Sequence, residues 1–191
     1  MAIDRLRAAA EGDRRRQETE ALEAIGRELT SRLDHAVMLQ RITDRARELA
    51  GSDFAFIAPV EAGGQAAVIA AVSGARTAGG MGARMEPGQG VSGRVLSTGE
   101  LFVTEHYLTD PRVSQEHAEI IAAEGVCGEA VLPLRFRGQV TGVLGVARRD
   151  RRVWTDADLR VLGKLADHAA VAIENARLLG EARVRESGCG L

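Results

Sequence analysis

The apolar residues of the chain follow a helical spacing at both ends and a strand-like spacing in between. Steps of three and four residues predict one helix over 22–33 and a second over 34–51, which is capped by its first residue. Near the other end, Thr155 and Asp158 form a capping-box sequence ahead of a long amphipathic stripe. We therefore expect helices at both ends of the domain, the last of them ending at Arg185.

Between these helices the apolar residues come in short runs that are typical of strands. A glycine-rich stretch over 74–86 predicts a loop, and two short segments predict helices over 90–97 and 115–123. Gly138 separates the last two apolar runs, as the turn of a hairpin requires. The predicted strands cover residues 54–60, 66–72, 101–104, 126–134 and 139–147. Strands grouped apart from helices predict an α+β fold with a mainly antiparallel sheet.

The composition narrows the class of protein. The 191 residues are enough for one domain with flanking helices, and 45% of them are hydrophobic. The formal net charge of −2 gives no reason to expect nucleic acid, because acidic residues surround the basic run 14–16. No apolar run approaches the ~20 residues of a membrane span, and no secretory signal follows Met1. We expect a cytoplasmic protein without a membrane partner.

Two sequence features that often carry chemistry have simpler explanations here. Cys127 and Cys189 are too few for a disulfide framework or a four-cysteine zinc site. The run Gly88–Gly93 matches G-x-G-x-x-G, but a polar loop precedes it where a dinucleotide fingerprint needs a buried strand. We interpret these glycines as the tight entry into a short helix.

Three longer segments carry a family resemblance. The run V-L-P-L-R-F-R-G-Q-V-T-G-V-L-G-V-A-R-R-D over 131–150, followed by W-T-D-A-D-L and a helix containing A-V-A-I-E-N-A-R-L-L, resembles the C-terminal half of a GAF domain. The run G-Q-G-V-S-G-R-V-L-S-T-G-E-L-F-V-T over 88–104 resembles the middle of GAF domains. E-H-Y-L-T-D-P-R with I-I-A-A-E-G-V is similar to GAF modules of bacterial transcriptional regulators and sensor histidine kinases.

The resemblance implies a domain organisation and a function. It places a GAF domain with dimerisation helices at 21–183, a charged extension, helical or disordered, at 1–20, and a tail at 184–191. The terminal helices would cover one face of the sheet, and loops and short helices would hold a ligand on the other. GAF domains are small-molecule sensors of signalling proteins, and their outer helices usually pair two protomers. We therefore expect a homodimeric sensor of an unknown small molecule, and not an enzyme.

Glu129 is the residue that most sharply points to a binding site. Strand alternation places it on one face with Cys127, in the middle of an apolar run. A buried carboxylate must be paired, hydrogen-bonded or protonated. It could orient a ligand amine or amide, or it could form an ion pair with Arg94 or Arg112. The predicted ligand contacts are Phe56, His106, Tyr107, His117, Cys127 and Glu129.

Other GAF chemistries remain as alternatives. Free methionine sulfoxide reductases of this family resemble the chain at Glu129 and would use Cys127, but two acidic residues that they need are replaced by Gly145 and Ala147. No cofactor is expected, although a haem-binding GAF sensor could use His106 or His117. A third alternative is a vestigial pocket on a module that only dimerises.

The cyclic-nucleotide members of the family can be compared at the end of the last strand. Their Asn-Lys pair is replaced by Ala147 and Arg148, which leaves cyclic-nucleotide binding in doubt. An ion pair between Arg148 and Asp158 is expected in place of the family's Lys–Asp link.

Overall fold

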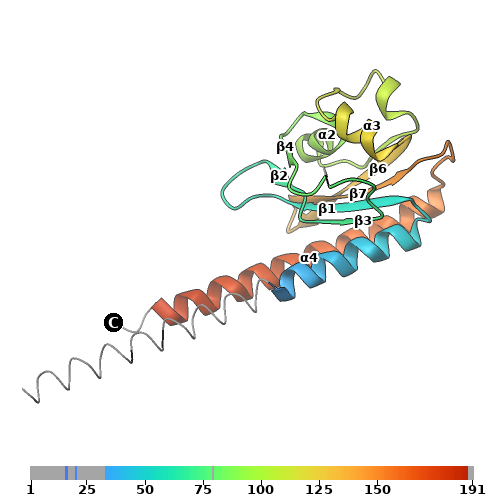
Figure 1. Ribbon diagram of the computed structural model, residues 1–191. Coiled ribbons are helices and arrows are strands. Elements are labelled where there is room, and N and C mark those ends of the chain that lie inside the picture. The colour runs from blue at the N-terminus through green and yellow to red at the C-terminus, as the bar shows by residue number, and fades with distance from the viewer. Residues whose placement is uncertain (1–15, 17–19, 21–32, 79, 189–191) are drawn as a thin grey trace, which may run out of the picture. The chain divides into compact units, whose positions relative to one another are not determined.

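The computed structural model describes residues 16, 20, 33–78 and 80–188 (Figure 1). The chain divides into two compact units, one of residues 36–175 and one of residues 1–35 with 176–191. The predicted helix over 22–33, apart from its last residue, lies outside the described residues, as does nearly all of the extension at 1–20. The predicted ligand contacts all belong to the unit of residues 36–175.

A five-stranded antiparallel sheet forms the centre of this unit, in the order β3-β1-β7-β6-β5. The long hairpin of β6 and β7 turns at Arg137 and Gly138, which both have positive φ, as expected for a two-residue turn of this hand. The strands are β1 (Phe54–Pro59), β3 (Ala71–Ser73), β5 (Phe102–Thr104), β6 (Gly128–Phe136) and β7 (Gln139–Arg148). The predicted α+β fold with a mainly antiparallel sheet is confirmed.

Two predicted elements of the sheet region are wrong. The run 66–72 is not one strand, because β2 (Ala67–Val68) pairs with β4 (Arg84–Met85) while β3 pairs with β1. β4 lies inside the stretch predicted as a loop. Between the two strands, the Ile69 N–H donates to Ala83, whereas the next N–H donates to Ile57 of β1. The chain therefore changes pairing partner in mid-run, which an alternation of apolar residues does not reveal.

The helices match the predictions more closely. The short ones are α2 (Gly90–Thr98), α3 (Ala118–Glu124) and the 3-10 turn η1 (Tyr107–Thr109), and α4 covers Asp156–Gly188. The capping box that begins α4 is confirmed, with Thr155 N donating to Asp158 and Asp158 N to the Thr155 hydroxyl, at 3.0 and 3.1 Å. α4 continues three residues beyond the predicted end.

The predicted cap at Asp34 is wrong. The N-terminal helix covers the described residues 33–49, so Asp34 already lies inside it. No glycine or proline interrupts the chain between residues 27 and 50, so nothing in the sequence forces the helix to restart at this point.

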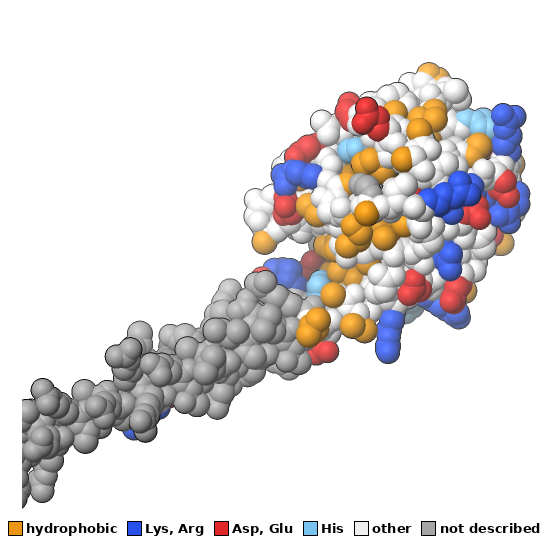
Figure 2. All heavy atoms as spheres, in the orientation of Figure 1, with side chains coloured by type: hydrophobic (Ala, Val, Ile, Leu, Met, Phe, Trp, Pro, Cys, Tyr) orange, Lys and Arg blue, Asp and Glu red, His pale blue; other side chains and the backbone are white. Residues whose placement is uncertain are grey.

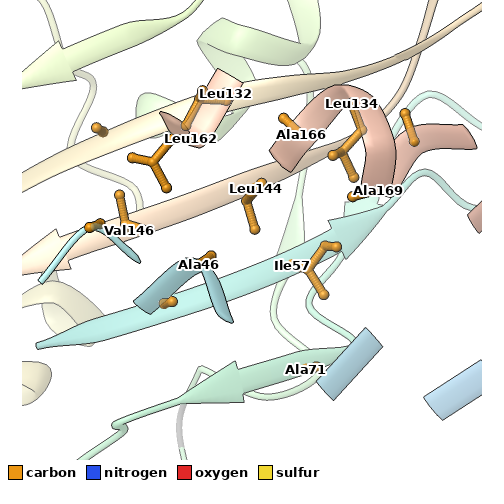
Figure 3. Close-up of a cluster of buried hydrophobic side chains, with 14 of the residues drawn as sticks. Ala46, Ile57, Ala71, Leu132, Leu134, Leu144, Val146, Leu162, Ala166 and Ala169 are labelled. Atoms are coloured by element: carbon orange, nitrogen blue, oxygen red, sulfur yellow. The ribbon is translucent and has the colours of Figure 1, made fainter. Parts of the chain in front are cut away.

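The sheet separates two apolar clusters. On one face the N-terminal helix and α4 pack against the strands, and Figure 1 shows them side by side there. Leu162 and Ala166 of α4 point toward Leu132 and Leu144 of the sheet (Figure 3). On the other face α2, α3 and the loops cover a second cluster. Because the long helices occupy the first face, the second is left to the short elements, as the sequence predicts.

Candidate functional site

Phe56 contributes a large apolar side chain to the sheet face beneath the short helices. Phe56 on β1 pairs with Gly145 on β7. Its ring occupies the space that a side chain at this glycine would need, since a β-carbon there would lie 2.1 Å from Phe56 Cε1. The ring therefore lies across β7, two positions along from Ala147, the strand partner of Glu129. On the outside of the domain, Figure 2 shows hydrophobic side chains in groups, with charged side chains around them.

Glu129 is the buried carboxyl of this face. It lies on β6 between Thr104 of β5 and Ala147 of β7, and 4% of it is exposed. Its carboxyl has no hydrogen bond or ion pair with any residue that the structure describes. Burial raises its pKa from 4.5 to about 8, because nothing replaces the lost hydration. The group is therefore mostly protonated at neutral pH and can donate as well as accept a hydrogen bond.

The alternative of an ion pair with Glu129 is wrong for both candidate arginines. Arg112 bonds to Asp110 at 2.6 Å and to the Val103 carbonyl at 3.2 Å. Its guanidinium and that of Arg94 each lie less than 5 Å from the Phe102 ring centre, at 4.8 and 4.7 Å. Both guanidinium groups therefore have other contacts, and neither pairs with the buried carboxyl.

Tyr107 brings a second polar group to this face. It is 2% exposed, and burial, followed by the nearby Glu129 charge, raises its pKa well above the usual range. The Val91 N–H at the start of α2 approaches its oxygen. A β-carbon at Gly90 would lie 2.7 Å from Tyr107 Oη, and Gly90 has φ +61°. Glycine at this position therefore lets the hydroxyl reach the helix start.

His117 reaches the same helix start as Tyr107. It precedes α3, and its Cδ2 would lie 3.0 Å from a β-carbon at Gly90. Its Nε2 is buried without a hydrogen-bond partner. Burial lowers the pKa of the ring below 6.5, so the imidazole is neutral at pH 7. Phe56, Tyr107, His117 and Glu129 thus share one side of the sheet.

His106 and Cys127 form a separate pair. Cys127 Sγ lies 3.6 Å from His106 Nδ1 and 3.6 Å from the Glu105 carbonyl oxygen, and His106 is exposed. Cys127 comes just before β6 begins at Gly128, so strand alternation does not fix the direction of its side chain. The structure therefore groups these two predicted contacts with each other at the surface.

A buried carboxylate that the sequence did not single out lies at the end of α3. Glu124 is 1% exposed and accepts from Arg76 N at 2.7 Å, Thr77 N at 2.8 Å and the Thr77 hydroxyl at 2.6 Å. Arg149 Nη2 pairs with it at 3.1 Å. Burial alone would raise its pKa, but these donors together lower it. Glu124 therefore fastens the loop after β3 to α3 and to the end of β7.

The expected ion pair between Arg148 and Asp158 is confirmed at 3.2 Å. The Arg148 guanidinium also lies 4.0 Å from the Trp154 ring centre and donates to the Ala50 carbonyl at 2.9 Å. These contacts hold Arg148 between the end of β7 and the start of α4, so its role there is structural.

A surface pocket of about 460 Å³ lies at the opposite end of the hairpin from Glu129. Its lining residues are Val60, Gly64, Gln65, Pro87, Leu96, Ser97, Gln139 and Val140.

Among the described residues, no group of three His, Cys, Asp or Glu side chains could hold a metal ion. In the same residues, no helix is long and apolar enough to cross a membrane.

These features define an α+β domain with helices on both faces of an antiparallel sheet, and comparison identifies its family. The GAF domain pattern matches residues 32–174, and the chain belongs to the GAF domain family. No curated protein matches the chain. Several of the solved structures that resemble it are GAF domains.

Three of these structures illustrate the kinds of protein that share this fold. The GAF domain of PixJ from Thermosynechococcus elongatus, in its blue-light absorbing form, has a TM-score of 0.65 at 14% identity, over 85% of this chain and 98% of that one. The second GAF domain of DevS from Mycobacterium smegmatis has 0.60 at 23%, over 80% and 99%. A type II free methionine-R-sulfoxide reductase from Thermoplasma acidophilum has 0.63 at 15%, over 76% and 96%.

Proposed function

We propose that this domain senses a small molecule on the sheet face that carries Glu129 and relays its presence to the terminal helices. The observation that carries the proposal is the buried, unpartnered carboxyl of Glu129, with the unpartnered His117 Nε2 on the same side of the sheet. Buried polar groups without partners are unfavourable, and a bound molecule would satisfy them. Apolar walls with a few such groups are typical of ligand sites.

The hairpin of β6 and β7 links this face to the helices. Val131 faces the ligand side, while its neighbour Leu132 and Leu144 of β7 face the other and pack in one cluster with Leu162 of α4. A ligand that prefers one arrangement of the hairpin would therefore shift the packing of α4. Strand alternation thus makes the hairpin the physical connection between the site and the output helices.

Pairing of two protomers through the outer helices is the second part of the proposal. Val37 on the N-terminal helix and Val161 and Val171 on α4 are exposed apolar residues. An apolar surface of this kind on neighbouring helices favours association with a second copy. Ile173 of α4 is only 3% exposed and belongs to the core, so a substitution there would disturb the fold and would not test association.

We expect light scattering to show a dimer for the wild-type protein and a monomer for Val171→Glu. The charge would have to be buried in the interface, where it has no partner. Leu108→Glu is the matched control, because Leu108 and Val171 are both 46% exposed and Leu108 lies on η1. A monomeric wild type at micromolar concentration, or a dimer that survives Val171→Glu, would contradict this arrangement.

The proposal includes binding without catalysis. The likeness to the Thermoplasma acidophilum reductase, at 15% identity, concerns the fold. Gly145 and Ala147, where the reductases need acidic residues, have no ionisable side chain, and Cys127 contacts His106 at 3.6 Å. We expect no thiol-dependent reduction of free methionine sulfoxide. Sustained turnover that Cys127→Ser abolishes would overturn the sensor assignment in favour of an enzyme.

A further inference from the structure

The buried carboxyl of Glu129 indicates what kind of molecule the proposed site can bind. Glu129 is 96% buried, since 4% of it is exposed, and it has no partner among the described residues. A carboxyl in this position is unfavourable unless a ligand completes its contacts. Because the side chain comes from the middle of the sheet, its contacts must be made within the site.

The surroundings of Glu129 are unsuited to an anion. The two candidate arginine partners, Arg94 and Arg112, lie on Phe102 and not on Glu129. Two N–H groups at the start of α2 are also taken, because Gly90 N donates to Ser114 Oγ at 2.8 Å and the Val91 N–H approaches Tyr107. An incoming anion would therefore meet a carboxyl and two helix-start donors that are already engaged.

The same surroundings are suited to a cation with an apolar body. Phe56, Tyr107 and Val131 are buried on this face with Glu129, so the apolar residues on this face are aromatic and aliphatic. Aromatic ring faces attract cations, most strongly where water is excluded. A carboxylate among such residues binds an amine or amidine with a charge-assisted hydrogen bond.

We propose that the site takes a small organic cation, an amine or amidine on an apolar body, and that Glu129 is its counter-ion. This proposal rests on the proposed function, because it names the ligand class of the same site. The step is a proton release: the O–H bond of the neutral Glu129 breaks, its proton goes to solvent, and the carboxylate pairs with the positive charge of the ligand.

Binding should then strengthen with pH. Burial raises the pKa of free Glu129 to about 8, so below that pH one proton must leave for each cation that binds. Tyr107 and His117 stay neutral near pH 7, because burial raises the pKa of the first and lowers that of the second. Glu116, next to the start of α2, has a lowered pKa and stays charged. Glu129 is therefore the group that titrates here.

Benzamidinium and benzamide are the probes that test this proposal, because they have the same shape and differ in charge. Two-dimensional NMR on the full chain would follow the amide signals of Tyr107, Val131 and Ala147 during titration. We expect benzamidinium to bind at least about tenfold more tightly than benzamide, and its affinity to rise by up to about tenfold per pH unit until about pH 8. Glu129→Gln should remove both the preference and the pH dependence.

The outcomes separate the ligand class from the proposed function. If benzamide or benzoate shifts the same signals as strongly as benzamidinium, the face is a ligand site but the cation proposal is overturned. If Glu129→Gln binds benzamidinium as tightly as the wild type, Glu129 is not the counter-ion. If benzamidinium, benzamide and benzoate all fail to shift any signal on this face, the cation proposal fails. The proposed function is tested separately, by native mass spectrometry of bound small molecules.

Discussion

Glu124→Gln is expected to lower the free energy of unfolding by about 3–5 kcal/mol, as for other broken buried ion pairs. The substitution leaves Arg149, whose side chain is 15% exposed, without its countercharge. It also turns an amide toward the N–H donors of Arg76 and Thr77, which need acceptors. Urea unfolding of the two proteins measures the difference.

Glu48→Gln is the control for this substitution. Glu48 forms an exposed ion pair with Arg45, with 62% of each side chain accessible, and such pairs contribute about 0.5 kcal/mol or less. If Glu124→Gln unfolds at the same urea concentration as Glu48→Gln, the buried contacts of Glu124 contribute nothing. The lowered pKa of Glu124 gives a second check. Its stabilisation is present above the unfolded pKa and should be lost as pH falls through the folded one.

Glu129→Gln is expected to act in the opposite direction and raise the free energy of unfolding. The folded pKa of about 8 lies above the ordinary value of 4.5. Keeping this group protonated in the fold therefore costs about 3 kcal/mol at pH 7. This cost is absent below the unfolded pKa, grows as pH rises, and levels off above the folded pKa. Glutamine keeps the shape and has no charge to lose.

Urea unfolding across pH 5 to pH 9 distinguishes this result from its alternative. We expect wild-type stability to fall relative to Glu129→Gln as pH rises, with the two proteins converging at the acidic end. A variant that unfolds more easily than the wild type at pH 7, with no ligand present, would show that Glu129 has a structural partner. The site would then lose its main polar anchor.

The two glutamates also show how far the sequence could be interpreted. Glu129 was identified because strand alternation places it among apolar residues. Its lack of a partner was not predictable, since it depends on Arg94 and Arg112 meeting Phe102 instead. Glu124 gave no signal, because a glutamate at the end of a short helix is usually exposed. Its partners come from loops and strand ends 25 to 48 residues away along the chain.

The fold was predictable where the pattern is local, and not where pairing is distant. The hairpin of β6 and β7 and the capping box at Thr155 depend on neighbouring residues, so their sequences specify them. The switch between β2 and β3 depends on which strand each half of the run meets. The separation of His106 and Cys127 from the buried group likewise depends on loop conformation, which alternation does not fix.

The central claim is that the Glu129 face binds a small molecule, and native mass spectrometry tests it most directly. Wild type and Glu129→Gln would each be incubated with a small-molecule extract of cells, exchanged into volatile buffer and weighed intact. We predict that the wild type retains an added mass that Glu129→Gln does not. Equal added masses on both proteins, or no added mass on the wild type, would contradict the claim.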